Sequence, residues 1–346
     1  MNLSNENPWN PTDSAISHYF LCTLETICTL AGTPLNTLLL VFHLTQQPPT
    51  TTSLLYVLLN CSDLLTCLLT WPAVASCWAH SRPLLFTNPV FREGWLVLWE
   101  VAGRWSVFLV GLQSIRRTVI LLRPFSRRVG KQALLGIVAG YGVLLLAIQS
   151  VRLFYRVWSS YSPRVHRPNF AVVWLQFAMG FYAPETALFL VCNAVFGYVI
   201  PFLPICVSCA ISVHVMMKRG RRASSSSRRA TENKRDATKT ILLLTATYIV
   251  TNTPLFLYDL NEILVTLSLT TGVNFVLISW GGFLRDHYST YVFLYTVCYN
   301  LCGLLNSTLN GFIFLCRTRA LKKFTRRLWS VTAVRIRDSA RKIRPV

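Results

Sequence analysis

The sequence alternates long apolar stretches with short polar segments. Seven of these stretches have roughly 20 residues or more, which is enough for a helix to cross the ~30 Å hydrocarbon layer of a bilayer. They run approximately over residues 19–44, 53–78, 94–122, 132–154, 186–217, 238–267 and 288–315. The pattern therefore predicts an all-α membrane protein, a bundle of seven transmembrane helices.

The polar flanks divide the chain into three parts. Residues 1–18 are polar and lack Lys and Arg, so we expect an extracellular N-terminus without a cleavable signal peptide. Residues 19–316 form the seven-span domain. Residues 317–346 are expected to form an amphipathic helix and a basic tail on the cytoplasmic side, because apolar residues such as Leu321 and Phe324 alternate there with Lys and Arg.

Composition and charge support a multi-pass membrane protein. Hydrophobic residues make up 53% of the chain and charged residues 14%, and the formal net charge is +21. With the N-terminus outside, 26 of the 34 Lys and Arg fall in the second and third inner loops and the tail. This basic inner face predicts contact with anionic inner-leaflet lipids and an acidic cytosolic partner, and it disfavours nucleic acid.

The third apolar stretch carries charges inside the predicted membrane span. Glu100 and Arg104 lie one helical turn apart, in the favourable order for an ion pair. Ionised groups at the bilayer centre are costly, about 2.5–3.5 kcal/mol each on insertion scales, so they need a partner or a polar cavity. Two interpretations stay open: a structural pair that fixes the rotation of the helix, or a role in ligand binding or switching.

A second set of polar residues falls at comparable depth in four spans. It consists of Asn36, Asp63, Ser106, Asn306, Ser307 and Asn310. A buried carboxylate surrounded by oxygen and amide groups must be protonated or hold a cation, and oxygen ligands suit a hard ion such as Na⁺. The alternative is an uncharged hydrogen-bonded network that joins the helices.

Other motifs concern modification, flexibility and catalysis. Asn2 begins a glycosylation sequon, and Ser224 follows two arginines in a serine-rich inner loop that suits phosphorylation. The cysteines lie mostly within spans, where Cys behaves as a small hydrophobic residue. The six histidines are scattered, and no nucleophile, base or metal set converges, so we expect no enzyme activity.

The polar and proline positions also follow a recognisable order along the spans. The positions are Asn36 in GTPLN, Asp63 in LNCSDLL, Arg117 in IRRTVILLRPF, Pro201, Pro254, and residues 306–314, NSTLNGFIF. Over about residues 19–330 this order resembles the rhodopsin-like (class A) G-protein-coupled receptors. The last two spans and the tail are loosely similar to invertebrate neuropeptide receptors of the FMRFamide type.

The chain departs from the family pattern at its inner end. Arg116 occupies the acidic position before Arg117, and Lys234 stands where many members carry an acid in span six. The resemblance therefore implies that an ionic restraint on the inactive state is lost and that basal activity is raised. Phe314 replaces the family's tyrosine in span seven, and Pro254 lacks the preceding tryptophan. The usual disulfide of the third span also lacks both of its cysteines.

The resemblance implies a signalling receptor for an extracellular ligand, with a heterotrimeric G protein and arrestin as inner partners. Trp99 occupies the aspartate position of amine receptors, so amines are disfavoured. Trp99, Glu100, Arg104, Asp259 and Glu262 are the expected ligand-binding residues, and the acidic ones favour a short basic peptide. A small chemosensory molecule is the alternative ligand, and a seven-helix transporter or channel is the alternative function.

Overall fold

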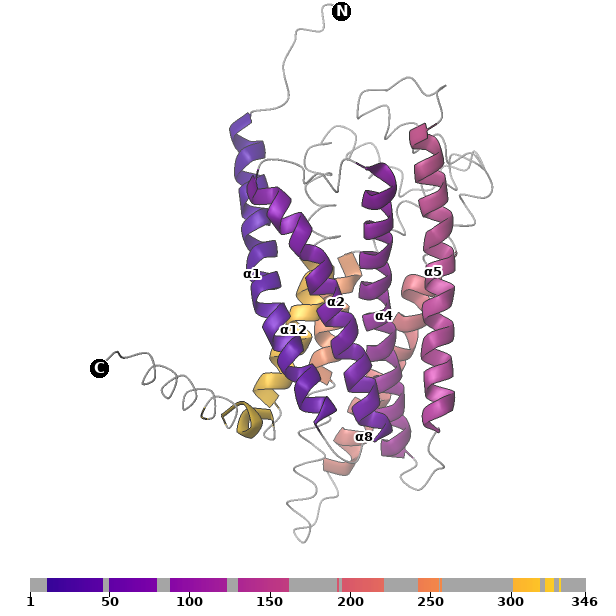
Figure 1. The fold of residues 1–346 in the computed structure, drawn as a ribbon. Coiled ribbons are helices and arrows are strands. Elements are labelled where there is room, and N and C mark those ends of the chain that lie inside the picture. Colours follow the sequence, from indigo (N-terminus) through magenta and orange to yellow (C-terminus); the bar gives the residue numbers. More distant parts are fainter. Residues whose placement is uncertain are drawn as a thin grey trace, which may run out of the picture.

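The computed structural model describes residues 11–45, 50–79, 88–122, 130–161, 192, 195–220, 242–254, 256, 301–317, 321–326 and 330. These residues are almost entirely helical (Figure 1). The elements are α1 (Pro11–Leu44), α2 (Thr51–Ala79), α4 (Pro89–Leu122), α5 (Lys131–Tyr161), the π-helix η1 (Val195–Val199), α8 (Ile200–Gly220) and α12 (Cys302–Arg317). Residues 242–254 and 321–326 are helical as well.

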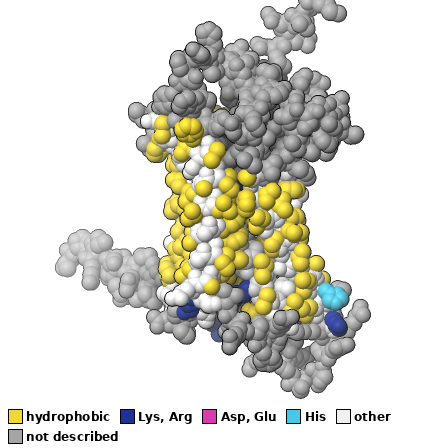
Figure 2. Space-filling model, turned by 90° about the vertical axis from the view of Figure 1, so that its right-hand side faces the viewer, with side chains coloured by type: hydrophobic (Ala, Val, Ile, Leu, Met, Phe, Trp, Pro, Cys, Tyr) yellow, Lys and Arg dark blue, Asp and Glu magenta, His cyan; other side chains and the backbone are white. Residues whose placement is uncertain are grey.

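Among the described residues, five helices are long and apolar enough to cross a membrane. They are Tyr19–Leu44, Thr51–Ala75, Val90–Leu122, Lys131–Val151 and Val195–Val215. These segments correspond to the first five predicted spans, while residues 242–254 fall within the sixth and α12 overlaps the end of the seventh. Apolar side chains cover the middle of the face shown in Figure 2, and Lys and Arg appear near its lower end. The predicted all-helical membrane bundle is confirmed.

Helix α4 is the centre of this bundle. It packs against α2, α5, α8 and α12, whereas α1 packs mainly on α2 and α12. In its most apolar window 61% of the residues are buried, against at most 44% in the other four membrane-capable helices. Charged and polar side chains on α4 therefore face other helices instead of lipid, which is where intramembrane polar groups are tolerated.

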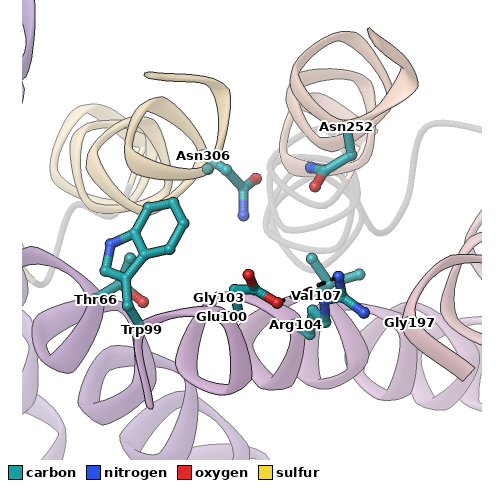
Figure 3. A pocket seen from close by; sticks show the side chains of 10 residues that line it. Thr66, Trp99, Glu100, Gly103, Arg104, Val107, Gly197, Asn252 and Asn306 are labelled. Atoms are coloured by element: carbon teal, nitrogen blue, oxygen red, sulfur yellow. Dashed lines mark ion pairs between the residues drawn. The ribbon is translucent and has the colours of Figure 1, made fainter. Parts of the chain in front are cut away.

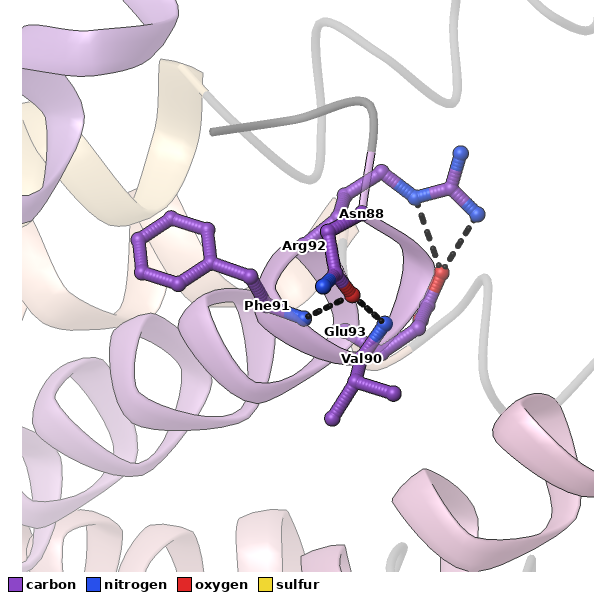
Figure 4. A network of polar contacts seen from close by, with 5 residues as sticks. All are labelled: Asn88, Val90, Phe91, Arg92 and Glu93. Carbon is purple, nitrogen blue, oxygen red and sulfur yellow. Dashed lines mark hydrogen bonds and ion pairs between the residues drawn. The ribbon is translucent and has the colours of Figure 1, made fainter. Parts of the chain in front are cut away.

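The N-terminus of α4 is fixed by a cap (Figure 4). Asn88 Oδ1 accepts hydrogen bonds from the backbone N–H groups of Val90 at 2.9 Å and Phe91 at 3.3 Å. Pro89 follows as the first helical residue, where its missing N–H costs nothing. Arg92 and Glu93 form an ion pair of 2.9 Å beside the cap. Because of this cap, α4 begins before the boundary predicted from apolar residues alone.

Aromatic side chains join α4 to α5 and η1. Phe108 stacks on Tyr141 with ring centroids 3.7 Å apart, and Trp105 Nε1 donates to the carbonyl oxygen of Val138 at 3.2 Å. The Tyr141 hydroxyl donates to the carbonyl oxygen of Phe196, one residue before Gly197 in η1. These contacts satisfy the polar ends of the aromatic groups inside the bundle and hold the π-helical turn against α5, which itself packs on α4.

A second aromatic cluster closes the end of the bundle where α1 ends and α2 begins. His43 of α1 stacks on Tyr56 of α2, and Phe314 of α12 packs edge-on against Tyr56, in each case at 5.0 Å. Phe324, in the helical residues 321–326, packs on Phe42 at 5.4 Å. Leu321 is fully buried, whereas Lys322 and Lys323 are exposed. The segment after α12 is therefore amphipathic over its described residues, as the sequence predicts.

One cysteine interpretation is wrong. Cys22 and Cys77, treated above as small hydrophobic residues, form a disulfide with their Cα atoms 5.9 Å apart. The bond joins the start of the apolar part of α1 to the end of α2. Since the two helices are antiparallel neighbours, Cys22 near the start of α1 and Cys77 near the end of α2 lie at the same height. Nearby, Trp78 Nε1 donates to Thr26 Oγ1 at 2.8 Å.

Candidate functional site

A small cavity lies in the middle of the bundle, beside α4. Its volume is about 40 Å³, and its lining comes from α2, α4, η1, α12 and the helical residues 242–254. Figure 3 shows the side chains around this space. The lining residues are Thr66, Trp99, Glu100, Gly103, Arg104, Val107, Gly197, Asn252, Gly303 and Asn306. Three of the expected ligand-binding residues, all on α4, are thus brought to one cavity.

Two opposite charges form one side of the cavity. Glu100 Oε2 and Arg104 Nη2 are 3.8 Å apart, and both residues are buried, at 6% and 7% exposure. The predicted i,i+4 pair is confirmed. The guanidinium lies against Gly197, where a Cβ atom would come within 2.6 Å of Arg104 Nη1. The absence of a side chain at Gly197 therefore makes room for the arginine.

Aromatic and amide groups form the other sides. Trp99 Nε1 donates to Thr70 Oγ1 at 3.1 Å, which holds the indole against α2. Asn306 on α12 and Asn252 on the opposite helix point their carboxamides into the space (Figure 3). Asn252 Nδ2 donates to the carbonyl oxygen of Tyr248 at 3.1 Å. The cavity thus presents a carboxylate, a guanidinium and two amides beside an indole.

A separate polar cluster surrounds Asp63. Ser106 Oγ donates to Asp63 Oδ1 at 2.5 Å, and Asn310 Nδ2 donates to Asp63 Oδ2 at 3.2 Å. Asn36 Nδ2 donates to the carbonyl oxygen of Ser307 at 3.2 Å. All five residues are at most 1% exposed. The structure therefore brings together five of the six residues predicted for a polar network, from α1, α2, α4 and α12.

The sixth member of that predicted network lies elsewhere. Asn306 lines the cavity beside Glu100 instead of contacting Asp63 in the described residues. The separation between the cavity and the Asp63 cluster follows from the sequence intervals. On α12 the cavity residue Asn306 precedes the cluster residue Asn310 by four positions, and on α4 the cavity residue Gly103 precedes the cluster residue Ser106 by three. The cavity is thus displaced by about one helical turn, ~5.4 Å, from the Asp63 cluster.

The C-terminal end of α4 is joined to α8 by hydroxyl groups. Thr118 Oγ1 lies 3.1 Å from the carbonyl oxygen of Ser208 and 3.1 Å from Ser212 Oγ. Its single proton has two acceptors, the Ser208 carbonyl oxygen and, at 3.0 Å, that of Ser114 on its own helix. All four residues are buried. Thr118 directly follows Arg116 and Arg117, both half-buried on the same helix. A neutral contact therefore connects these helices next to the predicted switch arginines.

The other predicted switch residues are only partly described. Phe314 is 4% exposed and belongs to the aromatic cluster with Tyr56 and His43. Pro254 is helical and half-buried. Asn2, Ser224, Lys234, Asp259 and Glu262 lie outside the described residues. Their proposed roles in glycosylation, phosphorylation, switching and ligand contact stay predictions.

Sequence reasoning missed several contributors to these sites. Gly197 and Asn252 line the cavity, but their roles depend on the way in which η1 and residues 242–254 face α4. A signal existed for the Cys22–Cys77 disulfide. The two cysteines are at similar distances from the short connection between two antiparallel spans, which places them side by side.

The comparison with protein families agrees with this arrangement. The family model described as "7 transmembrane receptor (rhodopsin family)" matches residues 36–314. A search of curated proteins finds no match. The matched range extends from Asn36 in the Asp63 cluster to Phe314 in the second aromatic cluster, and it includes the whole cavity lining. The chain therefore belongs to the rhodopsin family of seven-transmembrane receptors.

Proposed function

We propose that this G-protein-coupled receptor binds an extracellular ligand, preferably a peptide, at the cavity beside α4 and signals through its basic inner face. The observation that carries the proposal is the convergence of Trp99, Glu100, Arg104, Asn252 and Asn306 on one space. Buried charges and amides are expensive to maintain inside a membrane protein, so their convergence on one cavity favours a binding role.

The orientation proposed is an extracellular N-terminus in the plasma membrane. Disulfides form in oxidising compartments, and the Cys22–Cys77 bond lies at the end of the bundle where α1 begins its apolar part. The excess of Lys and Arg in the inner loops and tail supports the same orientation. The exposed Lys322 and Lys323 would then face anionic lipids of the inner leaflet.

A sodium ion at Asp63 is part of the proposal. Asn36 Oδ1 and Asn310 Oδ1 are buried and lack hydrogen-bond partners among the described residues. Together with the Asp63 carboxylate they offer the oxygen ligands that a hard cation takes. Ser106 and Asn310 already donate to both carboxylate oxygens, so the ion would have to replace part of this hydrogen bonding.

Small-molecule ligands are the second candidate, favoured by the 40 Å³ volume of the cavity. A peptide would place only an end group or one side chain in this space. A transport pathway would need one continuous polar path through Glu100, Arg104 and Asp63, but Asp63 is not among the residues that line the cavity. The structure thus supplies no argument for transport.

The test is ligand-independent recruitment of a panel of G proteins and arrestin to the expressed chain. We expect basal recruitment, because Arg116 and Lys234 replace acidic residues that restrain relatives with the usual motif. Arg117→Ala should abolish it. Lys131→Ala is the matched control, since it removes one exposed positive charge at the start of α5. Equal recruitment by the parent chain, Arg117→Ala and untransfected cells would refute raised basal signalling.

A further inference from the structure

We propose that the cavity beside α4 is a ligand subsite for an uncharged group that both donates and accepts hydrogen bonds, such as an amide or a hydroxyl. The inference rests on the proposed receptor function and narrows its ligand. It departs from the expectation that Glu100 meets a cationic group. The reasons are the charge balance of the cavity, its hydrogen-bonding atoms and its size.

The charges that line the cavity already balance. Glu100 and Arg104 are paired at 3.8 Å and buried from solvent. A cationic or anionic ligand group would leave a net charge in a region with little access to water. An uncompensated buried charge is strongly unfavourable, even where a balanced pair is tolerated. An uncharged group enters without disturbing this balance.

The two amides offer both kinds of hydrogen-bonding atom. Asn306 is 2% exposed, and its Oδ1 has no hydrogen-bond partner among the described residues. Asn252 Nδ2 already donates to the Tyr248 carbonyl oxygen and to Thr251 Oγ1, each at 3.1 Å, so its carbonyl oxygen is the atom left to accept. Figure 3 shows the Asn306 amide nitrogen, a donor, and the Asn252 amide oxygen, an acceptor, directed into the cavity from opposite helices. A group with donors and acceptors satisfies more of these atoms than one that has only one kind.

The size of the cavity limits the group further. A volume of about 40 Å³ exceeds the roughly 10–15 Å³ needed for one water molecule. There is space for about three waters or for one polar group of similar size. The subsite therefore takes a single end group or a short side chain, and the rest of the ligand stays outside it.

The test uses three small molecules of nearly the same shape and different charge. They are acetamide, acetate and acetamidinium, added to the full-length chain in lipid nanodiscs while thermal unfolding is followed. We expect acetamide to bind in the millimolar range and to raise the melting temperature by about 2 °C at ten times its dissociation constant. The two charged molecules should raise it less.

Gly303→Val provides the control for general solvent effects. A Cβ atom at Gly303 would meet Trp99 at 3.8 Å, an ordinary contact, so a larger side chain occupies part of the cavity without a clash from its first atom. The acetamide effect should disappear in this variant. Two further variants test the charge balance. Glu100→Gln should shift the preference to acetate, and Arg104→Gln should shift it to acetamidinium.

A larger effect of either charged molecule on the parent chain would overturn the proposal. So would an acetamide effect that survives Gly303→Val, or the absence of any effect of acetamide on the parent chain. If Gly303→Val does not fold, the preferences of Glu100→Gln and Arg104→Gln decide. Basal recruitment is measured in parallel: recruitment without acetamide binding rejects the subsite alone, and acetamide binding without recruitment rejects raised basal signalling alone.

Discussion

Replacing Gly197 with alanine would place a methyl group where the Arg104 side chain lies. The added Cβ would be 2.6 Å from Nη1, 3.3 Å from Cζ and 3.5 Å from Cδ of Arg104. The first distance is far shorter than a normal contact, so the guanidinium must move. Because Arg104 is buried and already 3.8 Å from Glu100, a displacement weakens the ion pair inside the bundle.

The expected loss of stability combines two opposing effects. Alanine is a better helix former than glycine by about 1 kcal/mol. Removing one partner of a buried pair costs about 3–5 kcal/mol, and a displaced arginine that keeps part of its interaction loses less. We therefore expect Gly197→Ala to lower the free energy of unfolding by about 2 kcal/mol, which corresponds to roughly 4 °C in melting temperature.

Thermal unfolding of the purified chain is the assay, and Gly140→Ala is the matched control. A Cβ atom at Gly140 on α5 would meet nothing within 4 Å, so this change should be neutral or stabilising. The clash is identified by repeating Gly197→Ala in an Arg104→Ala background. There the methyl group has no guanidinium to displace, and the added cost should vanish.

Two results would refute this reasoning. One is a Gly197→Ala variant that is as stable as the parent chain or more stable. The other is an equal loss of stability with and without Arg104, which would assign the cost to the π-helical backbone of η1 instead of the arginine.

Three more predictions follow from the same contacts. Glu100→Gln and Arg104→Gln should each lower the melting temperature, because each single change leaves one buried charge without its partner. The double variant should therefore lose at least about 1 kcal/mol less stability than the sum of the two single losses. Simple additivity of the losses in thermal unfolding would argue against the pair. Thr118→Val keeps the shape of the side chain but removes its hydroxyl, so it should lower the free energy of unfolding by about 1 kcal/mol. An unchanged melting curve would contradict the inter-helix hydrogen bond. Cys22→Ser and Cys77→Ser should each lower the melting temperature, since either change removes one disulfide worth about 2–4 kcal/mol. A parent chain with two free thiols at these positions by mass spectrometry would show that the bond is absent.

The candidate site was predictable where local spacing alone decides it. Glu100 and Arg104 pair because four residues make one helical turn, whatever surrounds them. Asp63 and Ser106 required more, since their hydrogen bond joins α2 to α4. The similar depth of these residues and their resemblance to family positions made that contact predictable. Asn306 also lines the cavity beside the Asp63 cluster, a position that depth along a span does not specify to within one turn.

The sequence by itself determined the apolar spans, the all-helical fold and the presence of paired charges in the third span. These properties follow from hydrophobicity and from hydrogen bonds within each helix, which a membrane enforces locally. Only the tertiary structure decided that Gly197 makes room for Arg104, that Asn252 and Asn306 face one cavity, and that Cys22 meets Cys77. These contacts join helices distant in sequence and depend on their rotation and relative height, which packing of all the side chains fixes together.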